Sequence, residues 1–544
     1  MRELFELVQR RNLARSRGET VVLATLVRTE GSTYRKPGAR AILGARGDVT
    51  GLVSGGCLEA DLASHALRMG DAAWKRVSYD FRDATDDEFG LGSGCRGAFD
   101  VVLERLPPDA RDGSFLAVEE SVGRGAPTVR RAFVFDAGGE WASLRGTTFA
   151  VGTSAVDPSA VPEAIRVAVR DVARGRAPAS LRVDGRDGFA DVLVETLVPP
   201  WSLAIFGAGG DAAALAEVAR VSGFRVDVFD PRTERLEAMA NLPGVSRHRI
   251  DLASPGAVVD AVPFDAAVVM THLARADRAV LATLARERSH ATYLGVLGPR
   301  SRTTALLAEG DVALDAATVW GPVGLPLGAS DPHGIALAVV AEIHGALAFR
   351  RDTPVHAVVL AAGASSRFGS PKIAAEFRGE TLLARTIRAL RAGGVEAVHV
   401  VAGAHVEEVS RIVREAADPA VDVVVHGGWA SGMAGSIRAG LGAVPIGAST
   451  LVAVADQPAL RASHVVRMIR AHVRSRGVVA SRYDGRLAVP ALFPEASRES
   501  LVALTGDAGA RALLGDHAAF VDLPHGDLDV DTPDDLSRAG EVLP

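Results

Sequence analysis

The stretch WSLAIFGAGGDAAALAEVARVSGFRVDVFD, residues 201–230, decides the fold class of this chain. An apolar run enters a glycine-rich turn, a stretch of helical composition follows, and a second apolar run ends at Asp230. Two further apolar runs, AAVVMTH (266–272) and ATYLGVLG (291–298), continue the alternation. Strands that alternate with helices in this way form parallel, doubly wound sheets. We therefore predict an α/β protein with a Rossmann-like domain over residues 198–350.

The glycine-rich turn of this unit matches part of a dinucleotide-binding fingerprint. Gly207 and Gly209 stand at the first two glycine positions, and Ala212 stands at the third. Asp230 follows about 20 residues later, where an acidic side chain meets the ribose of a dinucleotide. We expect Gly207, Gly209 and Asp230 to bind NAD(P) or a related nucleotide. A dehydrogenase reaction is disfavoured, since His272 is the only candidate that we find for hydride transfer.

A second α/β domain is expected over residues 354–544. After a polar break at 351–354, a new apolar strand leads into LAAGASSRFGSPK (360–372). Glycines let backbone N–H groups approach phosphate oxygens, and an Arg and a Lys supply positive charge. The alternative is a tight strand–helix turn with both cations on the surface. The residues expected to hold a triphosphate are Gly363, Ser365, Ser366, Arg367, Gly369 and Lys372.

Carboxylates follow the strands of the same domain. STLVAVADQP (449–458) places Asp456 just beyond an apolar strand, where open α/β sheets bind ligands. LDVDTPDDL (528–536) supplies Asp529 and Asp531 before an expected helix. We predict that Asp456 and Asp531 hold Mg²⁺ together with nucleotide phosphates. For Asp531 the alternative is stabilisation of the N-terminus of that helix.

Residues 1–106 are expected to form one compact α+β unit, and residues 107–197 a connecting region. Glycines flank both cysteines, in GLVSGGCLEADL (51–62) and GLGSGCRG (90–97). A helix beginning near Cys57 would offer free N–H donors and would lower the pKa of the thiol. The alternative is that Cys57 and Cys95 are small buried residues in turns. Polar groups of TEGSTYRKPGAR (29–40) that could reach an anionic ligand are Ser32, Tyr34, Arg35 and Lys36.

Composition narrows the function classes. The chain has 544 residues and a formal net charge of −6, so its overall field disfavours nucleic acid and anionic membranes. We find no apolar run of roughly 20 residues and no signal peptide, and we expect a cytoplasmic protein. The chain has only two cysteines, too few for a four-thiolate zinc site. In a reducing compartment we do not expect them to form a disulfide.

Taken together, the C-terminal motifs resemble the molybdenum cofactor cytidylyltransferases. The shared segments are the LAAG loop, the ADQP step, GGWASGMAGSIRAGL (427–441), GDAGARALL (506–514) and DVDTPDDL. The resemblance implies that a pterin phosphate attacks the α-phosphorus of CTP, with Mg²⁺ bound and Arg367, Lys372 and Asp456 at the reacting groups. LAAG rather than LAGG favours CTP over GTP. By the same resemblance, residues near the second substrate are Trp429, Gly432, Met433 and Ser436.

The N-terminal motifs resemble the xanthine dehydrogenase accessory proteins and their carbon monoxide dehydrogenase maturation relatives. GSTYRKPGA, VSGGCLE and GLGSGCRG carry this match, which resumes at LAIFGAGG, YLGVLGPRSRT and GPVGLPLGASDPHG. The resemblance implies binding of a molybdenum–pterin cofactor, with Cys57 and then Cys95 as candidate contacts, for a client molybdenum hydroxylase. At the position of Gly210 family members commonly carry a histidine, so no role for that histidine carries over.

Three functions remain open from the sequence. The favoured one is a cofactor maturation factor that also makes the cytosine dinucleotide form of the cofactor. The second is an NAD(P)-linked oxidoreductase fused to a sugar nucleotidyltransferase, and the third is a cofactor chaperone without catalysis. The client enzyme and the formation of a homodimer are not decided by the sequence.

Overall fold

The computed structural model divides the chain into two compact units, residues 1–200 and 201–544. The structure describes residues 2–82, 97–110, 115–123, 128–151, 161–172, 178–252, 254–256, 262–284, 291–308, 316–515 and 518–543. Both units mix helices with sheets, and the predicted α/β class is confirmed by the sheet order given below. Cys95 lies outside the described residues.

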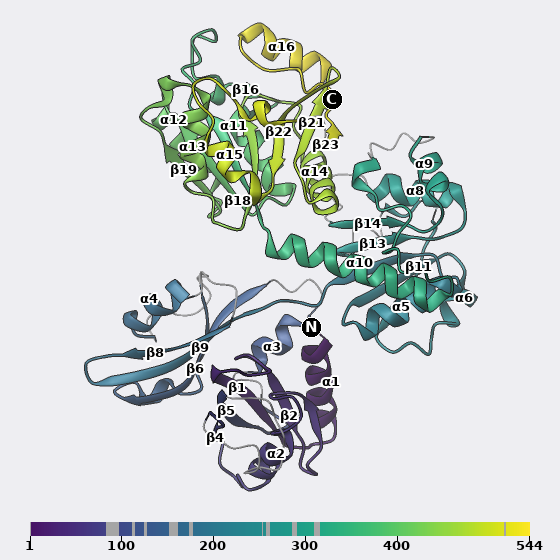
Figure 1. Ribbon diagram of the computed structural model, residues 1–544, viewed down its shortest axis with the longest axis vertical. Helices are drawn as coiled ribbons and strands as arrows, with labels where there is room; N and C mark the ends of the chain where they lie inside the picture. Colours follow the sequence, from purple (N-terminus) through teal and green to yellow (C-terminus); the bar gives the residue numbers. More distant parts are fainter. Residues whose placement is uncertain are drawn as a thin grey trace. The chain divides into compact units, whose positions relative to one another are not determined.

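The first unit begins with a five-stranded antiparallel sheet in the order β3-β2-β1-β5-β4 (Figure 1). Strand β1 is buried on both faces because successive side chains point to opposite sides of a strand. Val22 and Leu26 pack with helix α2, whereas Leu23 packs with helix α1. The elements are α1 (Arg2–Ser16), β1 (Val21–Gly31), β2 (Arg40–Leu43), β3 (Val49–Gly51), α2 (Glu59–Leu67), β4 (Trp74–Asp80) and β5 (Gly97–Leu106).

Residues 107–197, which we expected to connect two domains, contain a second antiparallel sheet in the order β7-β6-β9-β8. Helix α4 covers one face of this sheet through Ile165 and Val169. On the other face Phe133 and Leu193 pack against Val27 of the first sheet. The region therefore adds a folded layer to the first unit. Its elements are α3 (Leu116–Ser121), β6 (Val129–Gly139), β7 (Thr148–Ala150), α4 (Glu163–Val172), β8 (Ala179–Asp184) and β9 (Gly188–Leu197).

A buried ionic cluster also joins the two sheets of the first unit. Glu195 of β9 accepts hydrogen bonds from Arg40 of β2 and from Arg131 of β6, and all three side chains are at most 4% exposed. Burial opposes the charged form of Glu195, but the two guanidinium groups outweigh it and lower the pKa of Glu195 to about 2. The carboxylate therefore stays ionised between the sheets.

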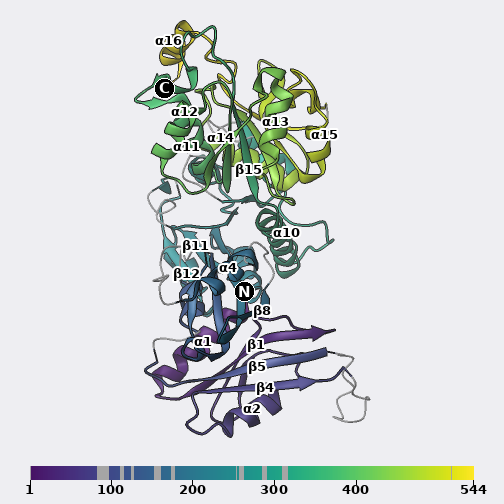
Figure 2. The same cartoon turned by 90° about the vertical axis from the view of Figure 1, so that its left-hand side faces the viewer.

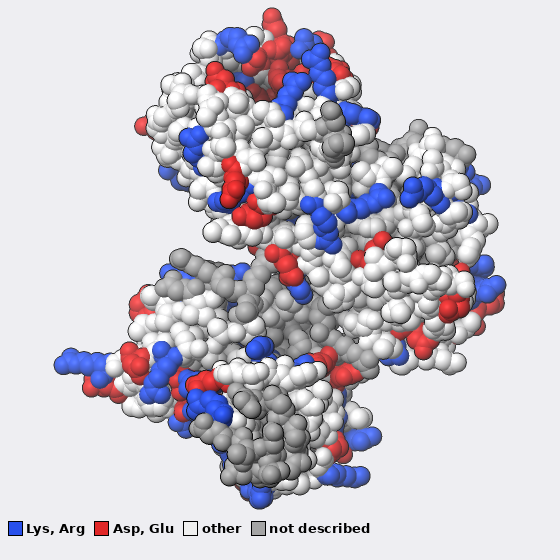
Figure 3. All heavy atoms as spheres, in the orientation of Figure 1, with Lys and Arg blue, Asp and Glu red and all other residues white. Residues whose placement is uncertain are grey.

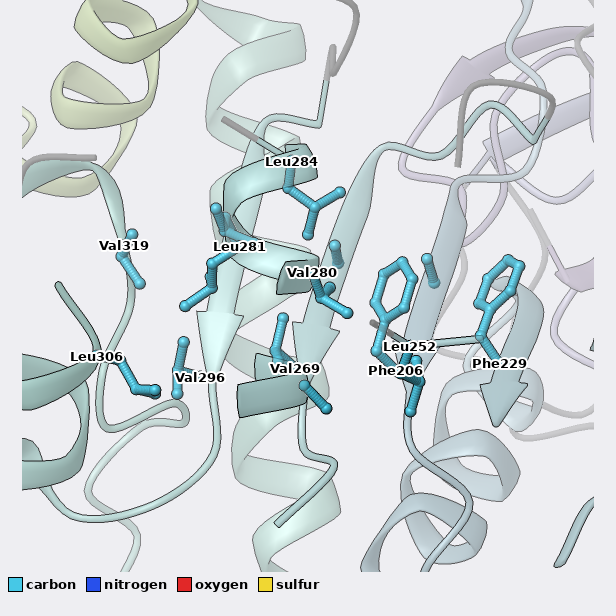
Figure 4. Packing of buried hydrophobic residues seen from close by; sticks show 14 of the residues in the cluster. Phe206, Phe229, Leu252, Val269, Val280, Leu281, Leu284, Val296, Leu306 and Val319 are labelled. Carbon is cyan, nitrogen blue, oxygen red and sulfur yellow. The ribbon is translucent and has the colours of Figure 1, made fainter. Parts of the chain in front are cut away.

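The second unit begins with the predicted Rossmann-like sheet, in which five strands run parallel in the order β12-β11-β10-β13-β14. Phe206, Phe229, Val269, Val280 and Leu281 belong to one buried cluster between this sheet and helix α8 (Figure 4). The elements are β10 (Ser202–Phe206), α5 (Gly210–Val221), β11 (Arg225–Asp230), α6 (Thr233–Glu237), β12 (Val245–Arg249), β13 (Ala266–Val269), α8 (Ala274–Leu284), β14 (Tyr293–Val296) and α9 (Arg300–Ala308).

Helix α10 (Pro332–Asp352) precedes the C-terminal domain and corrects one expectation. Its 21 residues are long and apolar enough to cross a membrane by length and composition, although we expected no such stretch from the sequence. One such helix is weak support for a membrane span, because the core helix of a globular domain passes the same test. Val339, Ile343 and Leu347 of α10 are buried in the fold.

The C-terminal domain contains a seven-stranded sheet in the order β19-β18-β15-β20-β22-β21-β23. Strands β19, β18, β15 and β20 are parallel, and β22 is antiparallel to both of its neighbours. Figure 2 shows α11, α12 and α14 on one side of β15 and α13 and α15 on the other. The main elements are β15 (Val355–Ala361), α11 (Leu382–Ala392), β18 (Ala397–Ala402), α12 (Val406–Ala416), β19 (Val421–Val425), α13 (Met433–Leu441), β20 (Ser449–Val454), α14 (Ala462–Ser475), β21 (Val479–Tyr483), β22 (Arg486–Phe493), α15 (Arg498–Val502), β23 (Ala519–Asp522) and α16 (Pro533–Val542).

Candidate active site

The loop after β15 is wound tightly around the serine at its centre. The carbonyl oxygen of Ser365 accepts hydrogen bonds from the backbone N–H groups of Phe368 and Gly369. The Ser365 hydroxyl accepts from the backbone N–H of Lys372 at 3.2 Å. Ser365 has φ 54° and Gly369 has φ 81°, a left-handed conformation that glycine adopts readily and that costs a serine energy. The loop therefore holds the Lys372 backbone next to its small-residue turn.

Lys372 joins the loop to two carboxylates from distant parts of the chain. Its Nζ lies 2.5 Å from Oδ2 of Asp456 and 2.9 Å from Oδ1 of Asp531. Arg367 reaches the other oxygen of Asp531, with Nη1 3.0 Å from Oδ2. Burial opposes the charge of Lys372, but Asp456 and Asp531 outweigh it and raise the pKa of the ammonium group. The predicted cations and the predicted metal-binding carboxylates therefore share one place in the fold.

The segment 529–531 lies beside the end of β20. The backbone N–H of Val530 donates a hydrogen bond to the carbonyl of Asp456 at 3.0 Å. Next to it, burial and the neighbouring Asp456 raise the pKa of Asp529 to about 6. The backbone contact between the two segments therefore sets the spacing of their carboxylates.

Asp531 does not cap helix α16, which was the alternative role for it. Thr532 is the N-cap, and its hydroxyl accepts a hydrogen bond from the backbone N–H of Asp535. The Asp535 carboxylate in turn accepts from the backbone N–H of Thr532, which completes a capping box. The Asp531 carboxylate is thus left to pair with Lys372 and Arg367.

The site opens into a cavity of about 370 Å³. Predicted residues that line it are Gly363, Ser365, Lys372, Trp429, Gly432, Met433, Ser436 and Asp456. Ser366, Arg367, Gly369 and Asp531 are outside the lining, although Arg367 and Asp531 are connected to it by ion pairs. Figure 3 shows acidic and basic side chains gathered together on the end of this domain that carries α16.

Asp507 also lines the cavity, although the sequence did not lead us to expect it there. It lies in the segment GDAGARALL, which supported the family resemblance without a residue being assigned. Flanking glycines around an acid were the available signal. The packing explains its position: the backbone N–H of Ala434 donates to the Gly506 carbonyl at 3.1 Å, which holds the loop against the start of α13.

The Rossmann-like glycine turn has the backbone geometry that the fingerprint predicts. Gly207 has φ 119°, and a Cβ atom there would lie 2.6 Å from the carbonyl oxygen of Met270, so only glycine fits. Gly209 caps helix α5. The ring of His272 lies beside this turn, with Nε2 3.6 Å from where a Cβ of Gly209 would be.

Asp230 is occupied by groups of the protein itself. It is fully buried, and its oxygens accept hydrogen bonds from the backbone N–H groups of Ala208 and Arg232 and from the Arg232 guanidinium. Burial raises the pKa of Asp230, but these donors outweigh it and lower the pKa below its usual value. Asp230 therefore organises the turn, and the half-exposed Arg232 guanidinium is paired with it.

Cys57 lies two residues before α2, so the helix begins slightly later than expected. Its Sγ lies 3.6 Å from the hydroxyl of Ser54. That hydroxyl donates to the buried carboxylate of Glu59 at 2.6 Å and accepts from the backbone N–H of Leu58. Of the four polar candidates named for the segment 29–40, Arg35 is already paired with Glu3, whereas Tyr34 is 73% exposed. The loop around Cys57 is thus organised by the Ser54–Glu59 pair.

The fold and the site define an α/β protein in which a Rossmann domain is joined to an NTP transferase domain. The chain matches the XdhC and CoxI family over residues 14–80, the XdhC Rossmann domain over 203–343 and the MobA-like NTP transferase domain over 357–520. It belongs to the XdhC and CoxI family and carries a MobA-like NTP transferase domain. The resemblance to the xanthine dehydrogenase accessory proteins and to the molybdenum cofactor nucleotidyltransferases is therefore confirmed.

Named relatives match different parts of the chain. A probable subunit of the xanthine dehydrogenase of Bacillus subtilis is 31% identical over 343 residues, 60% of this chain and 92% of that protein. The nicotine blue oxidoreductase of Paenarthrobacter nicotinovorans is 34% identical over 182 residues, 32% of this chain and 87% of that protein. A probable molybdenum cofactor guanylyltransferase of Opitutus terrae is 33% identical over 137 residues, 25% of this chain and 64% of that protein.

Proposed function

We propose that this chain matures a molybdenum–pterin cofactor and transfers CMP from CTP to it, releasing pyrophosphate. The observation that carries the proposal is the meeting of Lys372 with Asp456 and Asp531 at the mouth of a glycine-rich loop. An ammonium group and two carboxylates at one point can bind a triphosphate and its divalent ion. The molybdenum cofactor guanylyltransferase among the relatives supports the same chemistry.

In the proposed reaction, an oxygen of the pterin phosphate forms a bond to the α-phosphorus of CTP. The bond from the α-phosphorus to the bridging oxygen breaks, and pyrophosphate leaves with the electron pair. A phosphate monoester is largely ionised at pH 7, so the attacking oxygen needs no general base. The protein has to position the two phosphates and neutralise their charge, which Lys372 and Arg367 can do.

Asp456 and Asp531 both lie next to the Lys372 ammonium group. Two carboxylates this close together suit Mg²⁺, which binds proteins through one or two carboxylates and substrate phosphates. Among the described residues no group of three or more His, Cys, Asp or Glu side chains forms a metal cage, so the phosphates would complete the coordination. When bound, Mg²⁺ supplies positive charge to the leaving pyrophosphate. The residues that would hold it are Asp456 and Asp531.

The choice of CTP over GTP and the role of the N-terminal half are also part of the proposal. LAAG at 360–363 favours CTP, by resemblance to the cytidylyl branch. The first unit would hold the molybdenum–pterin cofactor near Cys57 for a client hydroxylase of the xanthine or carbon monoxide dehydrogenase type. The turn at Gly207 and Gly209 would bind a nucleotide. Tethering both activities on one chain raises the local concentration of their shared intermediate.

The test is pyrophosphate release from CTP and Mg²⁺ with and without the pterin cofactor. Release should require the cofactor, and Lys372→Ala should reduce it about 100-fold or more, as expected for loss of a group that stabilises transition-state charge. Arg486→Ala, an exposed arginine of β22 that does not line the cavity, is the matched control. Mass spectrometry of the product should show a pterin–cytosine dinucleotide. Release without cofactor, or full activity of Lys372→Ala, would refute the proposal.

A further inference from the structure

The wall of the cavity formed by Trp429, Ala430, Gly432, Met433 and Asp507 differs in character from the glycine-rich loop that leads to Lys372. Trp429 is partly exposed there and Met433 is 44% exposed, so apolar surface faces the cavity. Asp507 lines the same wall, and among the described residues its carboxylate has neither a hydrogen bond nor an ion pair. The wall thus combines two flat or flexible apolar side chains with one unpaired carboxylate.

Close backbone packing holds these three side chains together. Gly432 has φ 112°, and a Cβ atom there would lie 2.4 Å from the Gly506 carbonyl oxygen and 2.8 Å from Oδ1 of Asp507. A Cβ on Gly403 would lie 2.5 Å from Cβ of Trp429. Two glycines therefore let separate chain segments approach until the indole and the carboxylate share one wall. The fold therefore sets the position of the Asp507 backbone, while its exposed carboxylate stays open to a ligand in the cavity.

The charge of Asp507 limits what this wall can bind. Asp456 and Asp531 are both paired with Lys372, and Arg367 is paired with Asp531. Asp507 has no such partner in the described part of the chain, so it repels phosphate and attracts N–H donors. The wall therefore fits a part of the ligand that lies away from the phosphates and presents hydrogen-bond donors.

A 2-amino-4-oxopteridine meets these requirements. Its ring N3–H and its 2-amino group point the same way, so a carboxylate can accept both hydrogen bonds, as it does from the two parallel donors of an arginine. Its flat ring can stack on Trp429 and contact the thioether of Met433. Cytosine presents only its amino group as a donor on its base-pairing edge and cannot form the paired contact.

We propose that Asp507 reads the N3–H and 2-amino edge of the pterin while Trp429 and Met433 hold its ring. This assignment rests on the proposed function, because it presumes that the acceptor substrate is a pterin. It goes further by naming the residue that distinguishes a pterin from flat heterocycles that lack two parallel donors, such as cytosine and lumazine. Lumazine, which has an oxygen in place of the 2-amino group, presents one donor and one acceptor and should be rejected.

The first experiment measures binding of pterin and of lumazine by their own fluorescence, using the full chain with CTP and Mg²⁺. Neither probe carries a phosphate, so no transfer occurs. The wild type should bind pterin at least about tenfold more tightly than lumazine, equivalent to about 1.4 kcal/mol. Asp507→Asn should remove that preference, because the amide NH₂ opposes the ring N–H. Glu499→Gln, an exposed acid of α15 that does not line the cavity, should retain it.

The second experiment separates this inference from the proposed function. Affinity for CTP with Mg²⁺ should be unchanged in Asp507→Asn, while the KM for the pterin cofactor in pyrophosphate release should rise about tenfold. If wild-type protein binds pterin no better than lumazine, or if Asp507→Asn keeps the preference, the inference fails even though transfer continues. If Asp507→Asn instead weakens CTP or GTP binding, the carboxylate reads the nucleotide base and the inference is overturned. Absence of transfer in the wild type would refute the proposed function alone.

Discussion

At the residue scale, position in the fold decides what each charged side chain can do. Asp531 and Asp535 are four residues apart, yet one pairs with Lys372 and the other completes the cap of α16. Asp230 stands at the acidic position of a dinucleotide fingerprint, yet its oxygens accept hydrogen bonds from the Arg232 guanidinium and the backbone N–H of Ala208. The same residue type thus forms ion pairs, completes a helix cap or organises a turn according to its neighbours.

Asp531→Asn tests the separation of metal binding from capping. We expect the Mg²⁺ concentration for half-maximal pyrophosphate release to rise at least about tenfold. Loss of a residue that only hydrogen-bonds to a metal ligand already lowers metal affinity by about this factor. Thermal stability should stay close to that of the wild type, since the capping box does not use Asp531.

Thr532→Ala is the matched control for that variant. It should lower stability by about 1 kcal/mol through loss of the cap and leave the Mg²⁺ requirement unchanged. If Thr532→Ala shifts the Mg²⁺ dependence as much as Asp531→Asn does, the carboxylate acts only through the helix. Calorimetry and a Mg²⁺ titration of activity provide the two measurements.

At the element scale, two elements bury ionisable side chains that would usually be exposed. They are strand β9 in the second sheet of the first unit and helix α14 in the C-terminal domain. Strand β9 carries Glu195 at a position with 4% exposure, which a strand tolerates because Arg40 and Arg131 flank it. Helix α14 buries His464 and His472, whose pKa values fall to about 3 and about 4, both chiefly through burial. Each element therefore links stability to pH.

Glu195→Gln should destabilise the first unit by about 3 to 5 kcal/mol, because it leaves two buried guanidinium groups without a charged partner. Hydrogen exchange of β6 and β9 amides in a urea series measures this locally. The native pKa of about 2 is below the ordinary 4.5, so the wild-type stabilisation is complete above pH 4.5 and is lost as the pH falls toward 2.

Asp184→Asn, at an exposed ion pair with Arg182, is the control for that measurement and should cost less than about 1 kcal/mol. A similar small effect for Glu195→Gln would show that the buried cluster is dispensable. In that case the apolar contact of Phe133 and Leu193 with Val27 would hold the two sheets together.

Helix α14 should make the C-terminal domain sensitive to acid. The histidines bind protons near pH 6.5 when unfolded but only near 3 and 4 when folded, so stability is full above pH 6.5 and falls as the pH drops below it. His464→Gln should flatten this dependence between pH 6.5 and 4 in thermal denaturation. His525→Gln, at an exposed position, should leave the dependence as it is in the wild type.

At the scale of the whole molecule, the second unit joins the Rossmann sheet to the transferase sheet through helices α10 and α14. Nε of the buried Arg470 donates to the Ala291 carbonyl at 2.6 Å, and the Arg476 guanidinium stacks 3.6 Å from the ring centre of Phe349. These contacts reach from α14 to a Rossmann loop and to α10. They explain why residues 201–544 form one compact unit although they contain two large sheets.

Arg470→Ala should uncouple the two sheets of that unit. Loss of the buried contact leaves the Ala291 carbonyl without its donor, so we expect the calorimetric transition of the second unit to split into two. Arg486→Ala serves again as the exposed control. An unsplit transition with unchanged midpoint in Arg470→Ala would show that apolar packing alone couples the sheets.

Local sequence was sufficient for the features that depend on near neighbours. The alternation of apolar runs and helical stretches at 201–230 predicted β10, α5 and β11, since side-chain periodicity is a property of each element by itself. The loop ending at Lys372 and the carboxylate at Asp456 were predicted because each directly follows a strand. The antiparallel sheet of residues 129–197 was not predicted. Its strands β6 and β9 pair across about 50 intervening residues, and the sequence of each strand by itself does not reveal its partner.

The sequence by itself determined the α/β class, the glycine turns and the residue types of the loop at 363–372. Only the tertiary structure decided three arrangements. Lys372 pairs with Asp531, Arg232 donates hydrogen bonds to Asp230, and Asp507 lines the same cavity as Trp429. The reason is physical. The interaction energy between two charges depends on their separation and burial, and both are set when distant chain segments meet in the folded protein.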